Sequence, residues 1–192
     1  MRPCVESGIP LRIKNTFNPT HPGTVIVDDA PELNGALKAV TAIKGVAMIN
    51  VEGKGMIGVP GIAARTFGAV ARLDVSVLLI TQASSEQSIC FIVPEASAPA
   101  VVGGLEAEFA AELRRRDIER VYRRDDVAIV TIVGAGIQTT PGIAGRVFSA
   151  LGQHLVNVIA IAQGSSECGI SLVVATEDVA RAVEHIHELI VS

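Results

Sequence analysis

The chain carries an internal repeat, and this feature constrains its fold more than any other. When the sequence is shifted by 81 residues against itself, two segments superimpose without a gap, and about 20 of about 48 positions are identical. The matching stretches are Val46–Val51 with Val127–Ile132, Pro60–Ala63 with Pro141–Ala144, and Ile80–Glu86 with Ile161–Glu167. The chain is therefore two copies of one unit, preceded by a segment that is not repeated.

Each copy shows the same alternation of strand and helix patterns. In copy one, short apolar runs rich in β-branched residues predict strands, and apolar residues recurring at helical spacing predict helices. The predicted strands are Val46–Val51, Val75–Thr81, Ser88–Val93 and Ile118–Tyr122, and the predicted helices are Pro60–Arg72 and Pro99–Arg114. The order β-α-β-β-α-β is that of the ferredoxin-like arrangement, so we expect an α+β protein.

Copy two repeats this order but lacks a fourth strand. Its predicted strands are Val127–Ile132, Val156–Ala162 and Ile170–Ala175, and its predicted helices are Pro141–Gln153 and Glu177–Ile190. The strand-like segment Ala39–Lys44 lies just upstream of copy one, and we expect it to cover the bare sheet edge beside Val127–Ile132. The sequence thus predicts two ferredoxin-like βαββαβ domains, the first inserted into the second. Residues 45–124 form the first domain, and residues 39–44 together with 125–192 form the second.

Composition excludes several classes of protein. Apolar residues make up 49% of the chain, enough for a sizeable core, and aromatic residues make up only 3%, so Val, Ile, Leu and Ala must fill that core. The net charge of −4 lacks the basic surplus of a nucleic-acid-binding protein, and runs such as Val75–Ile80 are far shorter than the roughly 20 residues of a membrane-spanning helix. These two observations predict no nucleic-acid partner and no membrane partner. Because Cys4, Cys90 and Cys168 are odd in number and far apart, we expect reduced thiols in a cytoplasmic protein.

A glycine-rich segment, Gly53–Gly58, matches the G-x-G-x-x-G pattern of dinucleotide-binding sites between a strand and a helix. Copy two reads Gly134–Thr139 at the same place, so the third glycine is replaceable, and the following strand ends at Gln82, where a ribose-binding acid would be expected. Nicotinamide binding is therefore disfavoured. Two alternatives stay open: the glycines allow positive φ in a tight turn, or their N–H groups at a helix start hold a carboxylate.

Other polar residues give weaker signals. Gln82 and Gln163 recur at the same strand end of both copies, which favours a binding role over a strand end that merely faces water. The turn Ser84–Glu86 and its counterpart fit either a binding loop or a hydrogen-bonded turn. His185 and His187 lie on different faces of a helix, and no nucleophile, base and orienting trio can be assembled. We therefore predict neither a metal site nor a catalytic residue.

Two parts of the chain resemble aspartate kinases. Gly8–Pro19, followed by Pro22–Thr24, is similar to the end of that family's catalytic domain, and Ile80–Glu86 and Ile161–Glu167 look like the effector-loop motifs of its paired ACT domains. In that family one ACT unit is inserted within the other, which agrees with the strand argument. The family's N-terminal Lys-Phe-Gly-Gly-Thr-Ser motif and nucleotide-binding fold are missing. The resemblance therefore implies a regulatory C-terminal portion that is not itself catalytic, with residues 1–38 a remnant of the kinase domain and linker. A fragment, a separate regulatory subunit and a truncated reading frame all fit.

The resemblance implies end-product feedback. The parent enzyme phosphorylates L-aspartate with ATP and Mg at the head of lysine, threonine and methionine synthesis, and its ACT domains bind amino acids of that pathway; no cofactor is expected in this chain. Lysine-sensitive relatives carry an acid for the ligand's ammonium where this chain has Leu78 and Ile159. Threonine-sensitive relatives carry Ile-x-Gln, as in Ile80–Gln82 and Ile161–Gln163, so threonine is favoured and lysine comes next. The alternative is a free-standing ACT protein that senses an amino acid and acts on another protein.

The expected effector site joins the glycine-rich loop of one ACT unit to the strand-two end of a facing unit. In copy one the predicted binding residues are Met56, Gly58, Val59, Pro60, Gly61, Ile62, Ser76, Val77, Ile80, Gln82, Ser84, Ser85 and Glu86. In copy two they are Gly136, Thr140, Pro141, Gly142, Ile143, Asn157, Val158, Ile161 and Gln163. Bare sheet edges and apolar surface also predict a homodimer through the ACT units, and the implied protein partner is a kinase catalytic domain or subunit.

Overall fold

The structure, a computed structural model, describes residues 3–4, 7–26, 37–82, 87–134, 137, 140–164 and 169–191. The chain divides into two compact units, Met1–Gly35 and Ala36–Ser192. In the first unit, strands β1 (Leu11–Ile13) and β2 (Thr24–Ile26) form an antiparallel pair in which Arg12 lies opposite Val25.

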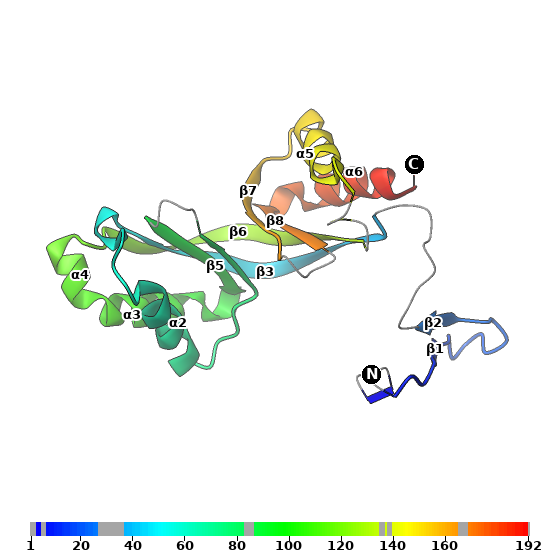
Figure 1. The fold of residues 1–192 in the computed structure, drawn as a ribbon, viewed down its shortest axis with the longest axis horizontal. Helices are drawn as coiled ribbons and strands as arrows, with labels where there is room; N and C mark the ends of the chain where they lie inside the picture. The colour runs from blue at the N-terminus through cyan, green and yellow to red at the C-terminus, as the bar shows by residue number, and fades with distance from the viewer. Residues whose placement is uncertain are drawn as a thin grey trace. The chain divides into compact units, whose positions relative to one another are not determined.

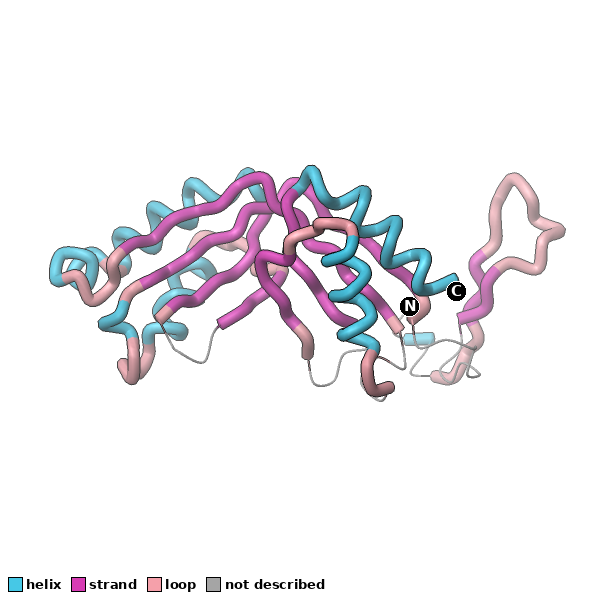
Figure 2. The backbone as a smooth tube through the Cα atoms, turned by 90° about the horizontal axis from the view of Figure 1, so that it is seen from above, coloured by secondary structure: helices cyan, strands magenta, loops and turns pink. Residues whose placement is uncertain are grey.

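The second unit is a six-stranded antiparallel sheet covered by helices. Its strands are β3 (Ala39–Glu52), β4 (Leu79–Gln82), β5 (Ser88–Pro94), β6 (Arg120–Val133), β7 (Val158–Ala162) and β8 (Gly169–Ala175). They lie side by side in the order β4-β5-β3-β6-β8-β7, which puts the two longest strands at the centre (Figure 2). The expected α+β class of two ferredoxin-like repeats is confirmed.

The helices gather at two ends of the long strands. Figure 1 shows α2, α3 and α4 beside one end and α5 and α6 beside the other. Their bounds, with those of three short 3-10 helices, are α2 (Ile62–Arg72), α3 (Ala98–Glu108), α4 (Ala110–Arg115), α5 (Ile143–Gln153), α6 (Val179–Val191), η1 (Lys54–Met56), η2 (Glu95–Ser97) and η3 (Thr176–Asp178). Among the described residues, no helix combines the length and the apolar character that a bilayer crossing requires.

Strands β3 and β6 each run through both copies. The first part of β3, Ala39–Ile43, pairs with Ile129–Val133 of copy two, and its second part, Val46–Glu52, pairs with β5 of copy one. The expectation that Ala39–Lys44 covers the open edge of copy two is thereby confirmed. The predicted separate strands around Tyr122 and Val127 are instead one continuous strand, because β6 keeps its pairing with β3 across the junction of the two copies.

A bulge lets the long strand β3 serve both halves. Side chains alternate between the two faces of a strand, yet Val40 and Ala42 pack into the copy-two core while Ala47 and Ile49 pack into the copy-one core. The first pair has even residue numbers and the second has odd ones, so in a regular strand the two pairs would face opposite sides of the sheet. One extra residue in β3, a β-bulge, brings both pairs to the same side. The register of β3 against β6 shifts between Ile43 and Val46, and Gly45, with φ of 70°, lies within this shift.

Three hydrophobic clusters hold the unit together. In copy one, Phe91 and Phe109 are fully buried between the sheet and its helices; in copy two, Leu172 and Ile186 are buried in the same way. A third cluster lies on the opposite face of the sheet. It takes residues from both copies: Val46, Met48, Leu79, Ile92, Val127, Ile129 and Val173. Burial of this shared face therefore links the stability of the two copies.

Two elements of copy one differ from their predicted bounds by more than two residues or by a break. The predicted strand Val75–Thr81 begins as β4 only at Leu79, although the Leu78 N–H already donates to the Ile92 carbonyl at 2.8 Å. The predicted helix Pro99–Arg114 is broken into α3 and α4 at Phe109, whose backbone leaves helical geometry at φ −102° and ψ 22°. The buried Phe109 ring fixes this break by packing into the core, where tertiary contacts outweigh helical periodicity.

An ion-pair network ties α2 to α3 and α4. The Arg65 guanidinium donates to Glu108 Oε1 at 2.9 Å and to Glu112 Oε1 at 2.7 Å, and it lies 4.6 Å from the centre of the Phe109 ring. Hydrogen bonds from Arg65 lower the pKa of both carboxyl groups. At the shift of 81 residues, Arg146 of copy two is equivalent to Arg65, but Leu189 is equivalent to Glu108, so copy two lacks the acidic partner of this network.

Candidate functional site

A cavity of about 330 Å³ lies between the glycine-rich loop, the start of α2 and the end of β4. Seven of its lining residues were predicted from the sequence as binding residues, and two were not. The predicted ones are Met56, Gly58, Val59, Pro60, Gly61, Ile62 and Gln82, and the other two are Ala63 and Ile89. The loop and the strand-two end of copy one therefore line one cavity within the same copy. The predicted site, which joins the loop of one unit to the strand-two end of a facing unit, stays a prediction.

The backbone around this cavity is already organised. The Met56 N–H donates to the Gly53 carbonyl and the Val59 N–H donates to the Met56 carbonyl, each at 3.1 Å, so these loop donors are used in the turn itself. Gly61 precedes α2 with φ of 90°, a left-handed conformation that favours glycine. The first turn of an α-helix has N–H groups without an intrahelical acceptor and a partial positive charge. The start of α2 is thus the part of the wall best suited to a carboxylate.

Close packing accounts for the first two glycines of the G-x-G-x-x-G segment. A Cβ atom at Gly53 or Gly55 would collide with the backbone of Asp117, so only glycine fits where the loop crosses this segment. The third glycine, Gly58, has φ of 67°. Each glycine therefore has a local packing or conformational reason.

A second cavity, of about 540 Å³, lies between β4 of copy one and β7 of copy two. Its lining includes both recurrent glutamines, Gln82 and Gln163, together with Val77, Ile80 and Ile161 from the predicted set. The remaining lining residues are Leu78, Leu79, Thr81, Ala162, Gly164 and Ser171. The two strand-two ends thus lie close to each other, and Gln82 borders both cavities.

The other predicted site residues that the structure describes lie outside these linings. In the part of the chain that the structure describes, Ser76 and Asn157 are exposed, Val158 is half-buried in β7, and Ile143 is buried in α5. Thr140, Pro141 and Gly142 are exposed just before α5. Ser84, Ser85, Glu86 and Gly136 lie outside the described residues.

The residues that sequence reasoning missed carry a signal in the repeat. Ala63 is identical to Ala144 and Ile89 is identical to Ile170 at the shift of 81 residues. Ile89 is buried at the start of β5, so its contribution to the cavity wall depends on the pairing of β4 with β5. The pattern showed recurrence, but strand pairing decided which recurrent residues meet.

A polar cluster lies on the helix-free face of copy one. The Tyr122 hydroxyl donates to Glu52 Oε1 at 2.6 Å, and Arg120 donates to Glu52 Oε2 from Nε at 2.9 Å and from Nη2 at 2.7 Å. Burial opposes ionisation of Glu52, but the hydrogen bonds from Tyr122 and Arg120 outweigh it and lower the pKa of this carboxyl. Burial, followed by the bond to Glu52, raises the pKa of Tyr122 to about 12.

Beside this cluster, Cys90 packs against the third hydrophobic cluster. It lies opposite Asn50 in the sheet, and its sulfur is 3.1 Å from the Ser88 hydroxyl. Burial raises the pKa of the Cys90 thiol, and a high pKa keeps a thiol protonated and unreactive.

Two interleaved βαββαβ repeats with a small cavity beside the first helix define a tandem ferredoxin-like α+β protein. The family model for the ACT domain matches residues 49–109 and 130–189, one match in each copy. The chain belongs to the ACT domain family.

Individual relatives show which kind of ACT-containing protein the chain resembles. The chain is 43% identical over 186 residues to a bifunctional aspartokinase/homoserine dehydrogenase of Haemophilus influenzae, a match that covers 97% of this chain and 23% of that protein. It resembles the solved regulatory subunit of aspartate kinase from Thermus thermophilus, with 29% identity and a TM-score of 0.68 over 80% of this chain and 98% of that one. It also resembles Clostridium acetobutylicum aspartate kinase, with 25% identity and a TM-score of 0.85 over 98% of this chain and 43% of that one. The resemblance to the regulatory region of aspartate kinases is thus confirmed, and the chain spans about a quarter of the length of the curated relative.

Proposed function

We propose that the chain binds a free amino acid in the cavity of copy one and, through this binding, controls an aspartate kinase catalytic domain. The observation that carries the proposal is the convergence of the α2 start, the glycine-rich loop and Gln82 on one cavity of about 330 Å³. This volume lies at the lower end of the range of small-molecule sites. The relatives that match the chain are aspartate kinases by name, which supports the choice of partner.

Threonine is the proposed effector, and lysine is the second candidate. The described residues that line the cavity include no carboxylate, so a lysine ammonium would be buried without an opposite charge. A threonine side chain needs apolar contact and one hydrogen-bond partner, and the cavity offers Ile62, Ile89 and the Gln82 amide. In this proposal the α-carboxylate lies against the start of α2, and the ammonium binds carbonyl groups near the end of β4.

Calorimetric titration of the 192-residue chain with L-threonine, L-lysine and L-methionine tests this proposal. We expect threonine to bind and Gln82→Ala to weaken it roughly 5- to 150-fold, since a buried hydroxyl without its partner costs about 1–3 kcal/mol. Gln163→Ala should have this effect only if copy two also binds, and Gln153→Ala, at the exposed end of α5, is the matched control. If both strand-end variants bind threonine like the parent chain, or if the parent binds lysine alone, the threonine assignment is wrong.

Self-association through the ACT units is part of the same proposal. Strands β4 and β7 are the two edges of the sheet, and each exposes an apolar side chain, Ile80 at 50% and Ile161 at 46%. A second copy of the chain would cover these edges. Light scattering should show a dimer, and Ile80→Lys combined with Ile161→Lys should shift it to the monomer. A parent chain that stays monomeric at every concentration, with and without effector, would argue against the homodimer.

The wider assignments remain predictions. The use of ATP and Mg belongs to the proposed kinase partner, and the cytoplasmic location rests on the expectation of reduced thiols. The proposed division places residues 45–124 in one ACT domain and residues 39–44 with 125–192 in the other. Limited proteolysis that releases residues 45–124 as a folded piece without disturbing copy two would contradict an interleaved pair.

A further inference from the structure

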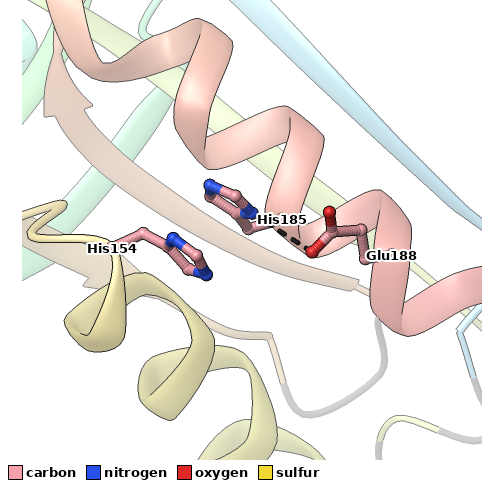
Figure 3. A group of neighbouring side chains, drawn as sticks. All are labelled: His154, His185 and Glu188. Atoms are coloured by element: carbon pink, nitrogen blue, oxygen red, sulfur yellow. Dashed lines mark hydrogen bonds and ion pairs between the residues drawn. The ribbon is translucent and has the colours of Figure 1, made fainter.

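Two histidines and a glutamate meet on the helices of copy two (Figure 3). His154 is the C-cap residue that directly follows α5, and His185 and Glu188 lie one turn apart on α6. The imidazole rings of His154 and His185 are stacked with centroids 3.3 Å apart and planes 11° from parallel, and His185 Nδ1 is 3.1 Å from Glu188 Oε2. One ligand atom from each residue lies within 4.8 Å of the others. The sequence did not predict this grouping, because His154 and His185 come together only through the packing of α5 on α6.

The repeat supplies an internal comparison for this cluster. At the shift of 81 residues, His154 corresponds to Leu73 and His185 corresponds to Gly104. Leu73 packs on Gly104 in copy one, since a Cβ atom at Gly104 would lie 3.0 Å from Leu73 Cδ1. Both copies therefore make the same helix contact. Copy one makes it with apolar atoms, and copy two makes it with groups that can bind a metal.

We propose that His154, His185 and Glu188 form a site for a divalent late transition metal ion, with Zn²⁺ as the probe. Neutral imidazoles and a carboxylate are ligands that suit Zn²⁺, and three protein ligands leave a fourth position for water or another ligand. His185 and Glu188 have the i, i+3 spacing that places both side chains on one helix face. This inference does not depend on the amino-acid effector, because the cluster lies on the helices of copy two and the proposed effector cavity lies in copy one.

Only a small rearrangement is needed for ligation. Ligand atoms around one Zn²⁺ lie roughly 3.3 Å apart, so the separation of up to 4.8 Å must shorten, and the stacked rings must turn until their lone pairs converge. Rotation about χ2 of histidine meets a broad, soft potential. The Glu188 side chain is 63% exposed and free to follow, while the His185 side chain is 16% exposed and held against the core.

The bound ion would join the end of α5 to the middle of α6. Leu151 and Ile186 are buried in the core below these helices, so the metal would add a link on the outer side of an already packed pair. Binding to the folded state alone raises stability by mass action. The expected consequence is a metal-dependent rise in the melting temperature that needs the α5–α6 contact.

Titration of the full 192-residue chain with ZnCl₂ by calorimetry, followed by thermal melts, tests this site. We expect saturable 1:1 binding, a higher melting temperature with Zn²⁺ and reversal by EDTA. His154→Ala, His185→Ala and Glu188→Gln should each weaken binding by at least about 10-fold. His187→Ala is the matched control, since His187 is exposed on the same helix and lies outside the cluster.

Cobalt distinguishes this site from binding to thiols. The chain has three cysteines, and Co²⁺ bound by thiolate gives an intense charge-transfer absorption, whereas Co²⁺ bound by imidazole and carboxylate gives only weak d–d bands. We expect the weak bands alone, and we expect His185→Ala to remove them. No saturable Zn²⁺ binding, a thiolate spectrum, or equal loss of affinity in His187→Ala and His185→Ala would each overturn the proposal; the stacked rings would then be a packing contact only.

Discussion

Replacing Phe91 by alanine tests whether the two ACT units unfold together. Phe91 is fully buried on β5, where its ring meets Phe67 edge-on at a centroid distance of 5.5 Å. Truncation of a buried phenylalanine to alanine costs about 3–5 kcal/mol. For a unit of this size each kcal/mol lowers the melting temperature by about 2–4 °C, so the variant should melt roughly 6–20 °C below the parent chain.

The equivalent change in copy two is Leu172→Ala, which should cost about 2–5 kcal/mol at a fully buried position. Because β3 and β6 run through both copies of the one six-stranded sheet, neither copy can unfold without breaking strands of the other. We therefore expect one transition in the parent chain and in both variants, moved as a whole to lower temperature. Gln153→Ala at an exposed position should change stability by no more than about 0.5 kcal/mol.

Circular dichroism melts and amide hydrogen exchange provide the measurement. Exchange of the most protected amides should lose the same free energy in β5 of copy one and in β8 of copy two, whichever copy carries the substitution. Two separate melting phases, with Phe91→Ala moving one and Leu172→Ala moving the other, would refute the argument that the shared strands couple the copies.

Three further outcomes are expected. Absorbance titration of the chain, which has one tyrosine and no tryptophan, should show Tyr122 ionising at a pKa of about 12. Since this pKa exceeds the ordinary value of 10, the associated stability is present below pH 10 and is lost as pH rises toward 12. Glu52→Gln should bring the pKa of Tyr122 closer to 10. Arg65→Met should cost on the order of 1 kcal/mol, allowing for a side chain that is 39% exposed, while Arg146→Met should not. In the parent chain the ion-pair contribution should fade as pH drops below 4.5, because the carboxyl groups of Glu108 and Glu112 have lowered pKa values. The purified chain should show no ATP-dependent phosphorylation of L-aspartate, and phosphorylation that survives removal of every contaminating kinase would contradict its regulatory assignment.

Much of the fold follows from local patterns that occur twice. Strand and helix periodicity is a short-range property, and the repeat allowed each prediction in one copy to be checked in the other. Copy two lacks a fourth strand of its own, and the strand-like segment Ala39–Lys44 was therefore predicted to pair with its first strand. The pairing of Ala39–Ile43 with Ile129–Val133 confirms this prediction. The loop and Gln82 of the candidate cavity were also predicted, because both recur at the same places in the repeat.

Other features depend on contacts between residues far apart in the sequence. Whether the predicted helix Pro99–Arg114 continues past Phe109 was decided by the core that receives the ring, since helical periodicity does not distinguish a buried break from a continuous helix. The glycines of the loop have their packing reason only when Asp117 lies across them. Ile89 reaches the cavity only through the register of β4 against β5.

The sequence by itself determined the two copies, their order of strands and helices, and the insertion of one in the other, because duplication and hydrophobic periodicity are written along the chain. Tertiary structure alone decided that β3 and β6 are continuous strands with a bulge at Gly45, and that the end of α5 brings His154 onto His185. The physical reason is that side-chain encounters are set by strand register and helix packing. A shift of one residue in register turns a side chain to the opposite face, and no local pattern records that choice.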